Sequence, residues 1–185
     1  MECYHGIVSA NHELQGSLTY NNLELQFSGG KGYIEKDWGI SFPESWIWLQ
    51  CNNFPSSDAS LFISIAKIPW RGHFFMGFIA FLYLDGKFHQ FSSYNRSRIS
   101  RVFMEGDQLL IELKRKSSTL RVSVAKHLTG ELKAPSTGNM SRRIKESIDS
   151  EVDVSLLEGN EEVVFQETGH RAGLEIEERI FDYLH

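Results

Sequence analysis

Hydrophobic and polar residues alternate along most of the chain, and turn residues separate the alternating runs. In residues 12–20, for example, Leu14, Gly16, Leu18 and Tyr20 fall on alternate positions. Such runs recur at intervals close to ten residues, which is typical of antiparallel strands joined by short turns. The pattern predicts an all-β fold, an antiparallel meander that closes into a barrel or packs as a sandwich, with at most one or two short helices.

Individual segments refine this prediction. Asp85-Gly86 indicates a hairpin between residues 73–84 and the strand that follows. Residues 134–150 interrupt the alternation and are expected to form a loop with a short helix. The last strand, beginning at Gly173, is expected to pair with the first strand and close the barrel. Residues 1–185 would then form a single β-barrel domain.

Composition narrows the classes of partner and compartment. The net charge of -5 excludes a strong electrostatic attraction to nucleic acid, so no nucleic-acid partner is expected. The most apolar run, residues 73–84, is too short for a transmembrane helix. Cys3 and Cys51 suggest buried free thiols in a reducing compartment. Together with the lack of a signal-peptide pattern, these features predict a cytoplasmic protein.

One strand of the predicted sheet has no face suited to water. In residues 45–53, Trp46, Trp48, Gln50 and Asn52 share one face, and mostly aliphatic residues share the other. We therefore expect this strand to be covered on both sides, as in a barrel wall with an external cover.

The preceding strand carries two acids on one face. Tyr33, Glu35 and Asp37 fall on one side, whereas Lys36 and Trp38 fall on the other. In a closed interior, repulsion between the carboxylates would raise the pKa of one and keep it protonated, as a general acid requires. On an exterior face the same pair would form a solvated or salt-bridged edge. The sequence leaves both alternatives open.

Other chemistries have weaker support. The Gly29-Gly30-x-Gly32 cluster lacks the following helix of a phosphate-binding loop. The seven histidines show no metal-ligand spacing, so no metal is expected. His5 and His12 could converge with a carboxylate, but their separation in an early hairpin is a weak indication. Nothing marks Cys51 as a nucleophile.

A resemblance adds to these observations. Residues 29–54, "GGKGYIEKDWGISFPESWIWLQCNNF", closely resemble the signature of the tocopherol cyclase-like family: a GYIEKDWG block, then FP, then W-x-W-x-Q and an amide pair. Residues 5–18 and 170–176 also resemble family segments. Full members are longer, so the chain looks like the C-terminal half of a two-barrel protein, in a bacterial relative.

The resemblance implies a fold and an activity. The family fold is a lipocalin-like β-barrel, often present as two related halves. Plant and cyanobacterial members close the chromanol ring of vitamin E. This ring closure is an intramolecular addition, and the enzyme is an intramolecular lyase of the isomerase class. The first double bond of a prenylated hydroquinol is protonated, and the phenol oxygen captures the tertiary cation. The resemblance implies neither a redox cofactor nor a metal.

The catalytic assignment follows from the two sources together. Glu35 or Asp37 would donate the proton, and Lys36 would tune or pair with these carboxylates. Protonating an alkene requires an acid shielded from water.

The remaining candidates would bind the substrate, a prenyl quinol or related isoprenoid. Trp46 and Trp48 would shelter the cation through their aromatic faces. Gln50 and Asn52 would orient the oxygen nucleophile, and Tyr33 and Trp38 would complete the wall of the pocket.

Two other hypotheses remain. The chain would be a non-catalytic, lipocalin-like binding module if the aromatic pocket holds a hydrophobic ligand without transforming it. Alternatively, its aromatic residues would pack against a partner, either an N-terminal β-domain or a second copy, and the isolated chain would then dimerise.

Overall fold

The computed structural model describes residues 3–127 and 130–184, which are almost entirely β-structure. The strands of the first half are β1 (Cys3–Glu13), β2 (Ser17–Tyr20), β3 (Leu23–Gln26), β4 (Lys31–Gly39), β5 (Trp46–Cys51), β6 (Ala59–Trp70), β7 (His73–Leu84) and β8 (Lys87–Ser92). Those of the second half are β9 (Arg98–Glu105), β10 (Gln108–Arg115), β11 (Ser118–Ala125), β12 (Gly130–Ser136), β13 (Asn139–Glu158) and β14 (Glu162–Ile176). A short 3-10 helix, η1 (Glu178–Tyr183), follows β14.

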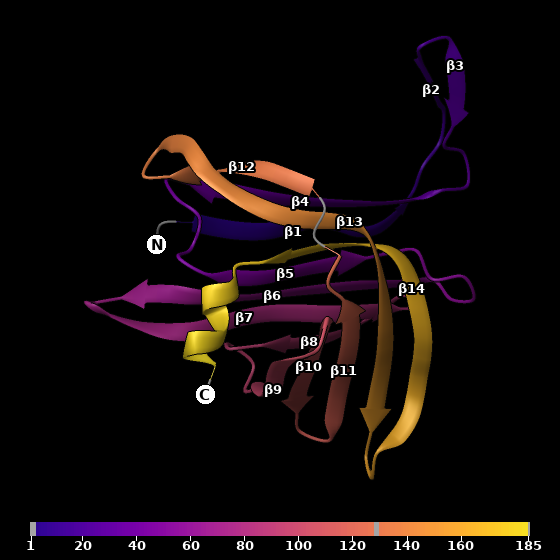
Figure 1. Cartoon of the computed structure of the whole chain (residues 1–185). Coiled ribbons are helices and arrows are strands. Elements are labelled where there is room, and N and C mark those ends of the chain that lie inside the picture. The colour runs from indigo at the N-terminus through magenta and orange to yellow at the C-terminus, as the bar shows by residue number, and fades with distance from the viewer. Residues whose placement is uncertain (1–2, 128–129, 185) are drawn as a thin grey trace.

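Ten of these strands form one antiparallel sheet. Its order is β8-β7-β6-β5-β14-β13-β11-β10-β9, and β12 pairs with the upper part of β13. The long strands β13 and β14 curve down the side of the molecule and link β5–β8 to β9–β11 (Figure 1). The sheet therefore bends around its own core.

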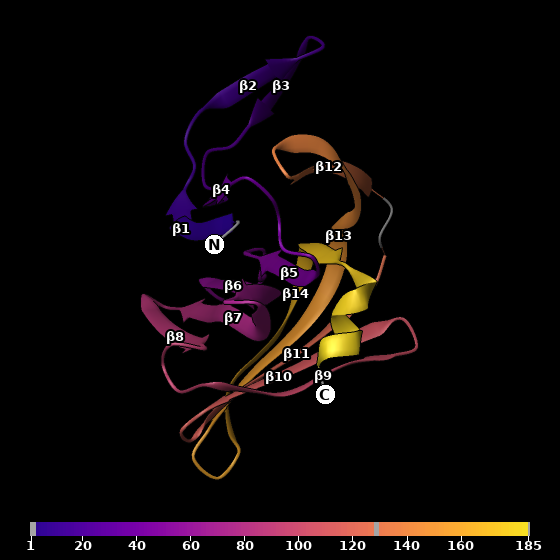
Figure 2. The same cartoon turned by 90° about the vertical axis from the view of Figure 1, so that its left-hand side faces the viewer.

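The main core lies on the inner face of this bent sheet. Ile63 on β6 and Leu82 on β7 are fully buried in one cluster with Leu113 on β10 and Leu120 on β11. The view in Figure 2 shows β6 and β7 on one side of this core and β10 and β11 on the other. Each large aliphatic side chain buried in this way contributes about 1.5–3 kcal/mol relative to exposure.

A two-stranded ribbon of β1 and β4 covers the outer face of β5 and β6 (Figures 1 and 2). Between its strands the chain extends into a hairpin of β2 and β3, here called the arm, which projects from the body. On the arm, the cross-strand pairs Leu18–Leu25 and Tyr20–Leu23 stand on one face.

The structure confirms the all-β prediction but not the closed barrel. Within the described ranges, β8 and β9 are the edges of the sheet and do not pair with each other. The expected pairing of the first and last strands is wrong, because β14 pairs with β5 and β13 whereas β1 pairs with β4. The first strand belongs to the outer ribbon, so it is not available to close the sheet.

The prediction of a loop with a short helix in residues 134–150 is also wrong. This segment forms the end of β12 and the first part of β13, with Arg142 and Ile144 on alternate positions less exposed than Arg143 and Lys145. Arg, Lys and Glu favour helix, but pairing along β12 and β14 overrides that weak preference.

Two local predictions are confirmed. The strand around residues 45–53 is β5, with Ile47 and Leu49 in the main core and Trp46 packed on the outer face with Phe42. Asp85 and Gly86 form the turn between β7 and β8, both with positive φ. Among the described residues, no helix is long and apolar enough to cross a membrane.

Candidate functional site

The ribbon brings three titratable side chains together above the outer face of the sheet. In the register of β1 and β4, His5 lies opposite Asp37 and Ile7 lies opposite Glu35. Because side chains alternate along a strand, all four point to the same side of the ribbon, toward β5 and β6. We call His5, Glu35 and Asp37 the acid cluster.

His5 is the centre of this cluster. Its Nδ1 lies 2.5 Å from Asp37 Oδ1, and its Nε2 lies 3.7 Å from Glu35 Oε2. The ring stacks on Phe62 of β6, with a centroid distance of 5.1 Å and an interplanar angle of 11°. The packing and the hydrogen bond together fix the orientation of the imidazole.

The charge on His5 is set by opposing effects. Burial acts to lower the pKa of the ring, but the hydrogen bond with Asp37 and the negative charges of Asp37 and Glu35 outweigh it, and the pKa lies above its usual value. Nε2 is buried and has no hydrogen-bond partner among the described residues. The two carboxylates therefore favour the protonated form of the ring.

Glu35 is fixed as a hydrogen-bond acceptor. Its Oε2 accepts hydrogen bonds from the Tyr33 hydroxyl at 2.6 Å and from Trp48 Nε1 at 3.0 Å. Burial, followed by the contact with Glu35, raises the pKa of Tyr33 well above its usual value, so the phenol keeps its proton and remains a donor. The side chains of Glu35 and Asp37 are 20% and 30% exposed, so neither acid extends freely into solvent.

A third carboxyl group approaches from β14. Trp46 Nε1 donates a hydrogen bond of 2.8 Å to Glu175 Oε2. Burial raises the pKa of Glu175 to about 7, although this hydrogen bond opposes the shift. Negative charges nearby, including those of Glu35 and Asp37, add to the increase. The Glu175 carboxyl therefore keeps its proton to a higher pH than an ordinary glutamate does.

Arg142 of β13 holds the loop beside the cluster. Its guanidinium donates hydrogen bonds of 2.7 Å to the carbonyl oxygens of Pro43 and Glu44, and one of 2.6 Å to Glu177. The same group lies 4.6 Å from the centroid of the Trp46 ring. This cation–π contact and the three hydrogen bonds fix the indole and the loop together.

These residues enclose a hollow of about 80 Å³. Its lining combines the acid cluster and Glu175 with the neighbouring aromatic and small residues Phe42, Pro43, Trp46, Trp48, Ser64 and Ala66. The hollow lies between the ribbon and the outer face of the sheet, not inside a closed barrel. Its volume is well below the roughly 300–1,000 Å³ of a typical ligand pocket.

The structure divides the nine sequence-derived candidates. Four of them, Glu35, Asp37, Trp46 and Trp48, line the hollow, and Tyr33 reaches it through its bond to Glu35.

The other four lie elsewhere. Lys36 and Trp38 point to the opposite side of the ribbon, where Lys36 Nζ lies 5.4 Å from the Trp38 ring and Trp38 stacks on Tyr4. Lys36 therefore does not join the two acids. Gln50 lies near the end of β5 and Asn52 follows that strand, and neither lines the hollow.

The acid cluster also offers donors for a metal ion. One ligand atom from each of its three residues can be chosen so that all lie within 4.8 Å of one another. However, metal binding needs a neutral imidazole, and the raised pKa of His5 favours the protonated ring. The arrangement fits a proton better than a metal ion.

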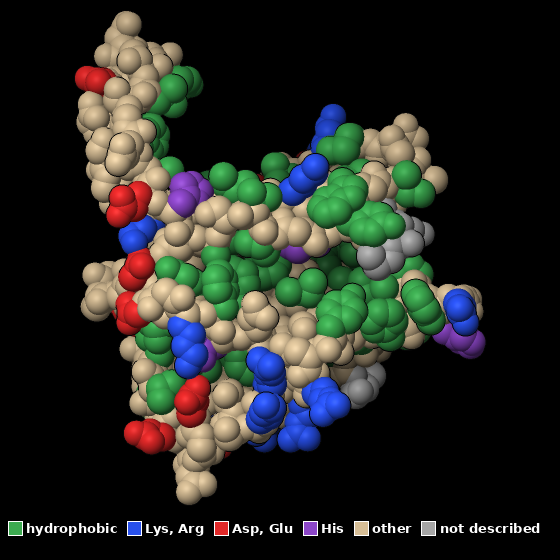
Figure 3. All heavy atoms as spheres, turned by 180° about the vertical axis from the view of Figure 1, so that it is seen from behind, with side chains coloured by type: hydrophobic (Ala, Val, Ile, Leu, Met, Phe, Trp, Pro, Cys, Tyr) green, Lys and Arg blue, Asp and Glu red, His purple; other side chains and the backbone are tan. Residues whose placement is uncertain are grey.

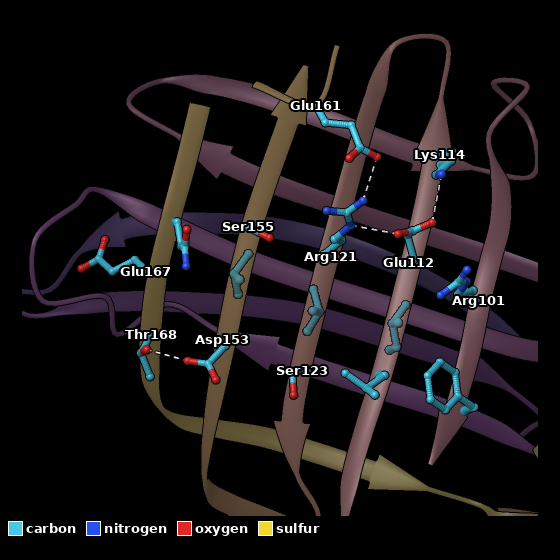
Figure 4. Close-up of a pocket in the computed structure, with 16 residues that line it drawn as sticks. Arg101, Glu112, Lys114, Arg121, Ser123, Asp153, Ser155, Glu161, Glu167 and Thr168 are labelled. Atoms are coloured by element: carbon cyan, nitrogen blue, oxygen red, sulfur yellow. Dashed lines mark hydrogen bonds and ion pairs between the residues drawn. The ribbon is translucent and has the colours of Figure 1, made fainter. Parts of the chain in front are cut away.

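A larger hollow of about 1060 Å³ lies on the outer face of β10, β11, β13 and β14 (Figure 4). Several of its charged groups pair with one another: Arg121 bridges Glu112 at 2.9 Å and Glu161 at 3.0 Å. Asp153 accepts a hydrogen bond from Thr168. This face is a polar sheet surface with an internal ion-pair network, and we do not assign the reaction to it.

Three residues of the site escaped sequence reasoning: His5, Arg142 and Glu175. His5 was considered only as a weak partner for a carboxylate. Glu175 sits in a strand that alternates normally, and its contact with Trp46 spans 129 residues. The sequence gives no local signal for Glu175. Its place beside the tryptophans becomes clear only when the register between β14 and β5 is known.

Comparisons with known proteins identify the family of the chain. Residues 2–177 match the model of the tocopherol cyclase-like family. A probable chloroplastic tocopherol cyclase of Oryza sativa subsp. japonica is 28% identical over 80 residues, which are 41% of this chain and 17% of that protein. The chloroplastic tocopherol cyclase of Zea mays is 33% identical over 51 residues, 28% of this chain and 11% of that protein.

A solved structure gives a broader overlap. Kievitone hydratase from Nectria haematococca superposes with a TM-score of 0.48 and 15% identity, covering 95% of this chain and 53% of that one. The chain thus matches about half of that protein and less than a fifth of each curated relative. The family match spans nearly the whole chain, and the chain belongs to the tocopherol cyclase-like family.

Proposed function

We propose that this protein catalyses the acid-promoted addition of an oxygen nucleophile to a double bond of a prenylated hydroquinol or related isoprenoid. The observation that carries the proposal is the acid cluster, in which His5 contacts two carboxylates beside two tryptophan rings. Membership of the tocopherol cyclase-like family supports the same class of reaction.

The proposed reaction is an isomerisation. A proton adds to the less substituted carbon of the double bond and leaves a cation on the tertiary carbon. The phenol oxygen attacks that carbon and forms the C–O bond, and the phenol proton returns to the cluster. No electrons are exchanged with a redox partner. Water in place of the phenol would give hydration by the same steps.

We assign Asp37 as the immediate proton donor. The short contact with His5 Nδ1 lets the imidazolium pass a proton to Oδ1. Glu35 instead accepts two hydrogen bonds through Oε2, which hold this oxygen in the role of an acceptor. Its negative charge can stabilise the cation, and the faces of Trp46 and Trp48 can do the same.

The size of the hollow limits what enters it. At about 80 Å³ it accommodates the reacting end of a molecule, not a whole prenyl quinol. The rest of the substrate must lie outside this hollow. Lys36 and Trp38, on the far side of the ribbon, have no place in the proposed site.

The proposal is tested by incubating the protein with a prenyl hydroquinol and measuring chromanol by mass spectrometry. We expect Asp37→Asn to lower kcat at least about 100-fold, because general acid catalysis contributes about 10²–10⁴-fold. His5→Gln should lower kcat to a similar extent. Lys36→Gln is the matched control: it removes a charge from the same strand but on the opposite face, and kcat should stay near that of the parent.

Equal activity of Asp37→Asn and the parent would contradict the assignment. If the parent binds the hydroquinol but forms no chromanol or hydrated product, the non-catalytic binding module becomes the better description.

A further inference from the structure

We propose that a second hollow, between β1 and the outer face of β7 and β8, binds the branched hydrocarbon tail of the ligand. This proposal rests on the proposed function, because it assigns the part of the substrate that the acid-cluster hollow cannot hold. It names a separate binding surface that can be tested without turnover.

The hollow has the size and lining of a site for an apolar ligand. Its volume is about 380 Å³, within the roughly 300–1,000 Å³ usual for such sites. Apolar residues from three strands form most of its walls, chiefly Ile7, Ala10, Ile79, Phe81 and Phe88. None of its lining residues is Lys, Arg, Asp or Glu, and Ser9, Gln90, Ser92 and the Tyr94 hydroxyl supply its polar groups.

Several of these side chains remain exposed to water. Ile79 is 37% exposed, Phe88 47% and Tyr94 78%. Covering apolar surface with a hydrocarbon chain gains about 25 cal/mol per Å² removed from water. With no charged group to desolvate, the hollow favours a hydrocarbon over a sugar, nucleotide or peptide with charged side chains.

The hollow lies beside the acid cluster along β1. His5 and Ile7 are adjacent on the inner face of β1, and two residues of strand span about 7 Å. His5 lines the first hollow and Ile7 lines the second. A molecule with its reacting end at the cluster can therefore extend its chain along β1.

A row of aromatic rings packs beneath the surface between the two hollows. The His5 ring stacks on Phe62 at 5.1 Å, and Phe62 lies 5.5 Å from Phe81. Phe81 in turn lies 5.3 Å from Phe88 at the far wall. Phe62 is fully buried beneath His5 and Tyr33, so the row supports the two hollows from below, and only its outer members Phe81 and Phe88 line the second hollow.

The direct test is binding of farnesol, a prenyl alcohol without a hydroquinol ring, measured by displacement of the fluorescent probe N-phenyl-1-naphthylamine. We expect Ile79→Asp to weaken farnesol binding at least about tenfold, because it places a charge in the apolar wall. Ile79→Val keeps the wall apolar and should bind within about twofold of the parent. Val163→Asp on β14 changes a side chain that is 52% exposed outside the hollow, and it should bind like the parent.

A second measurement locates the ligand without relying on mutant folding. A farnesol analogue with a diazirine at the tail end is photo-crosslinked, and the labelled peptides are identified by mass spectrometry. We expect labels within residues 73–94 and 3–13. Labels in β10–β14, or no farnesol binding by the parent, would overturn the proposal.

The outcomes separate this inference from the proposed function. Farnesol binding that falls with Ile79→Asp supports the tail site even if no chromanol is formed. Chromanol formation with unchanged farnesol binding by Ile79→Asp overturns the tail site and leaves the reaction standing.

Discussion

His5 contacts the carboxylates of Glu35 and Asp37 and joins them in one cluster. Two acids on one strand face would repel each other, but His5 contacts both and Tyr33 and Trp48 donate hydrogen bonds to Glu35. The arrangement answers the question that the sequence left open: the acids are neither in a barrel interior nor on a freely solvated edge. They lie between two layers of strands.

Glu175 gives a prediction about stability and pH. Its pKa is about 7 in the folded protein against 4.5 for the reference group, so the folded state binds more protons between these values. Stability should therefore fall as the pH rises from about 4.5 to about 7, by at most about 3 kcal/mol from this residue. Urea unfolding of the parent and Glu175→Gln at pH 5, 6, 7 and 8 measures the effect.

The variant should show a shallower decline with pH than the parent. Some decline should remain, because the raised pKa of His5 acts in the same direction: its contribution is lost as the pH rises through its folded value. Identical slopes for the two proteins would show that Glu175 is ionised throughout.

The sequence allowed part of this site to be predicted. Glu35 and Asp37 could be paired from the two-residue period of one strand. Trp46 and Trp48 could be placed on one face by the same argument. His5 and Glu175 could not be placed with them, because those contacts depend on strand pairing across 32 and 129 residues.

At the scale of elements, β14 and β5 fit together because one position lacks a side chain. Gly173 pairs with Gln50, and a Cβ atom at Gly173 would lie 2.8 Å from the Trp48 ring. Trp48 can therefore lie across β14 and reach Glu35 only if this position is glycine. This close approach positions one wall of the acid-cluster hollow.

We expect Gly173→Ala to lower the free energy of unfolding by about 1–3 kcal/mol, the usual cost of overpacking. The same change in a Trp48→Leu background should cost less, because the smaller side chain removes the clash. Denaturant unfolding of the four proteins gives the coupling energy directly. A cost that is the same in both backgrounds would mean that the ring is not the cause.

The elements differed in how readily sequence revealed them. β5 was recognised, with both faces covered, because tryptophans and aliphatic residues alternate without any solvent-facing set. β13 was mistaken for a loop and helix, because its first half carries Arg, Lys and Glu and its pairing partners lie in other segments. Burial of Ile144 against Trp46 and Ala134 is a tertiary contact that no local pattern encodes.

For the whole molecule, the exposed arm is the feature with the clearest consequence. Its apolar face presents Leu18, Tyr20, Leu23, Leu25 and Phe27, which are 40–66% exposed. Figure 3 shows hydrophobic side chains along one side of the arm and across the adjoining face. Five large side chains about half exposed amount to on the order of 500 Å² of apolar surface.

This surface predicts weak self-association. Two copies that cover each other's arms would bury on the order of 1,000 Å², which is near the lower limit for a specific interface. Sedimentation velocity should show a dimer that grows with protein concentration, and Leu18→Ser with Leu23→Ser should shift the protein toward the monomer. A parent that stays monomeric at every concentration would contradict the prediction.

The all-β class of the fold was predictable from the sequence, but whether the sheet closes into a barrel was not. Alternation and turn residues identify an all-β protein, because both are local signals. Closure depends on which strands meet, and the chain uses β1 as an outer cover instead of a barrel strand. That choice also moves the candidate site from the interior to the space between ribbon and sheet.

In the proposed reaction, the proton that adds to the double bond comes from solvent through the acid cluster. When the prenyl hydroquinol is converted in D2O, the chromanol should carry one deuterium that does not exchange, on the carbon next to the newly oxygenated carbon. The rate of its incorporation should fall with Asp37→Asn and remain with Lys36→Gln. A chromanol formed by the parent without that deuterium would show that no proton from the acid cluster reaches the double bond.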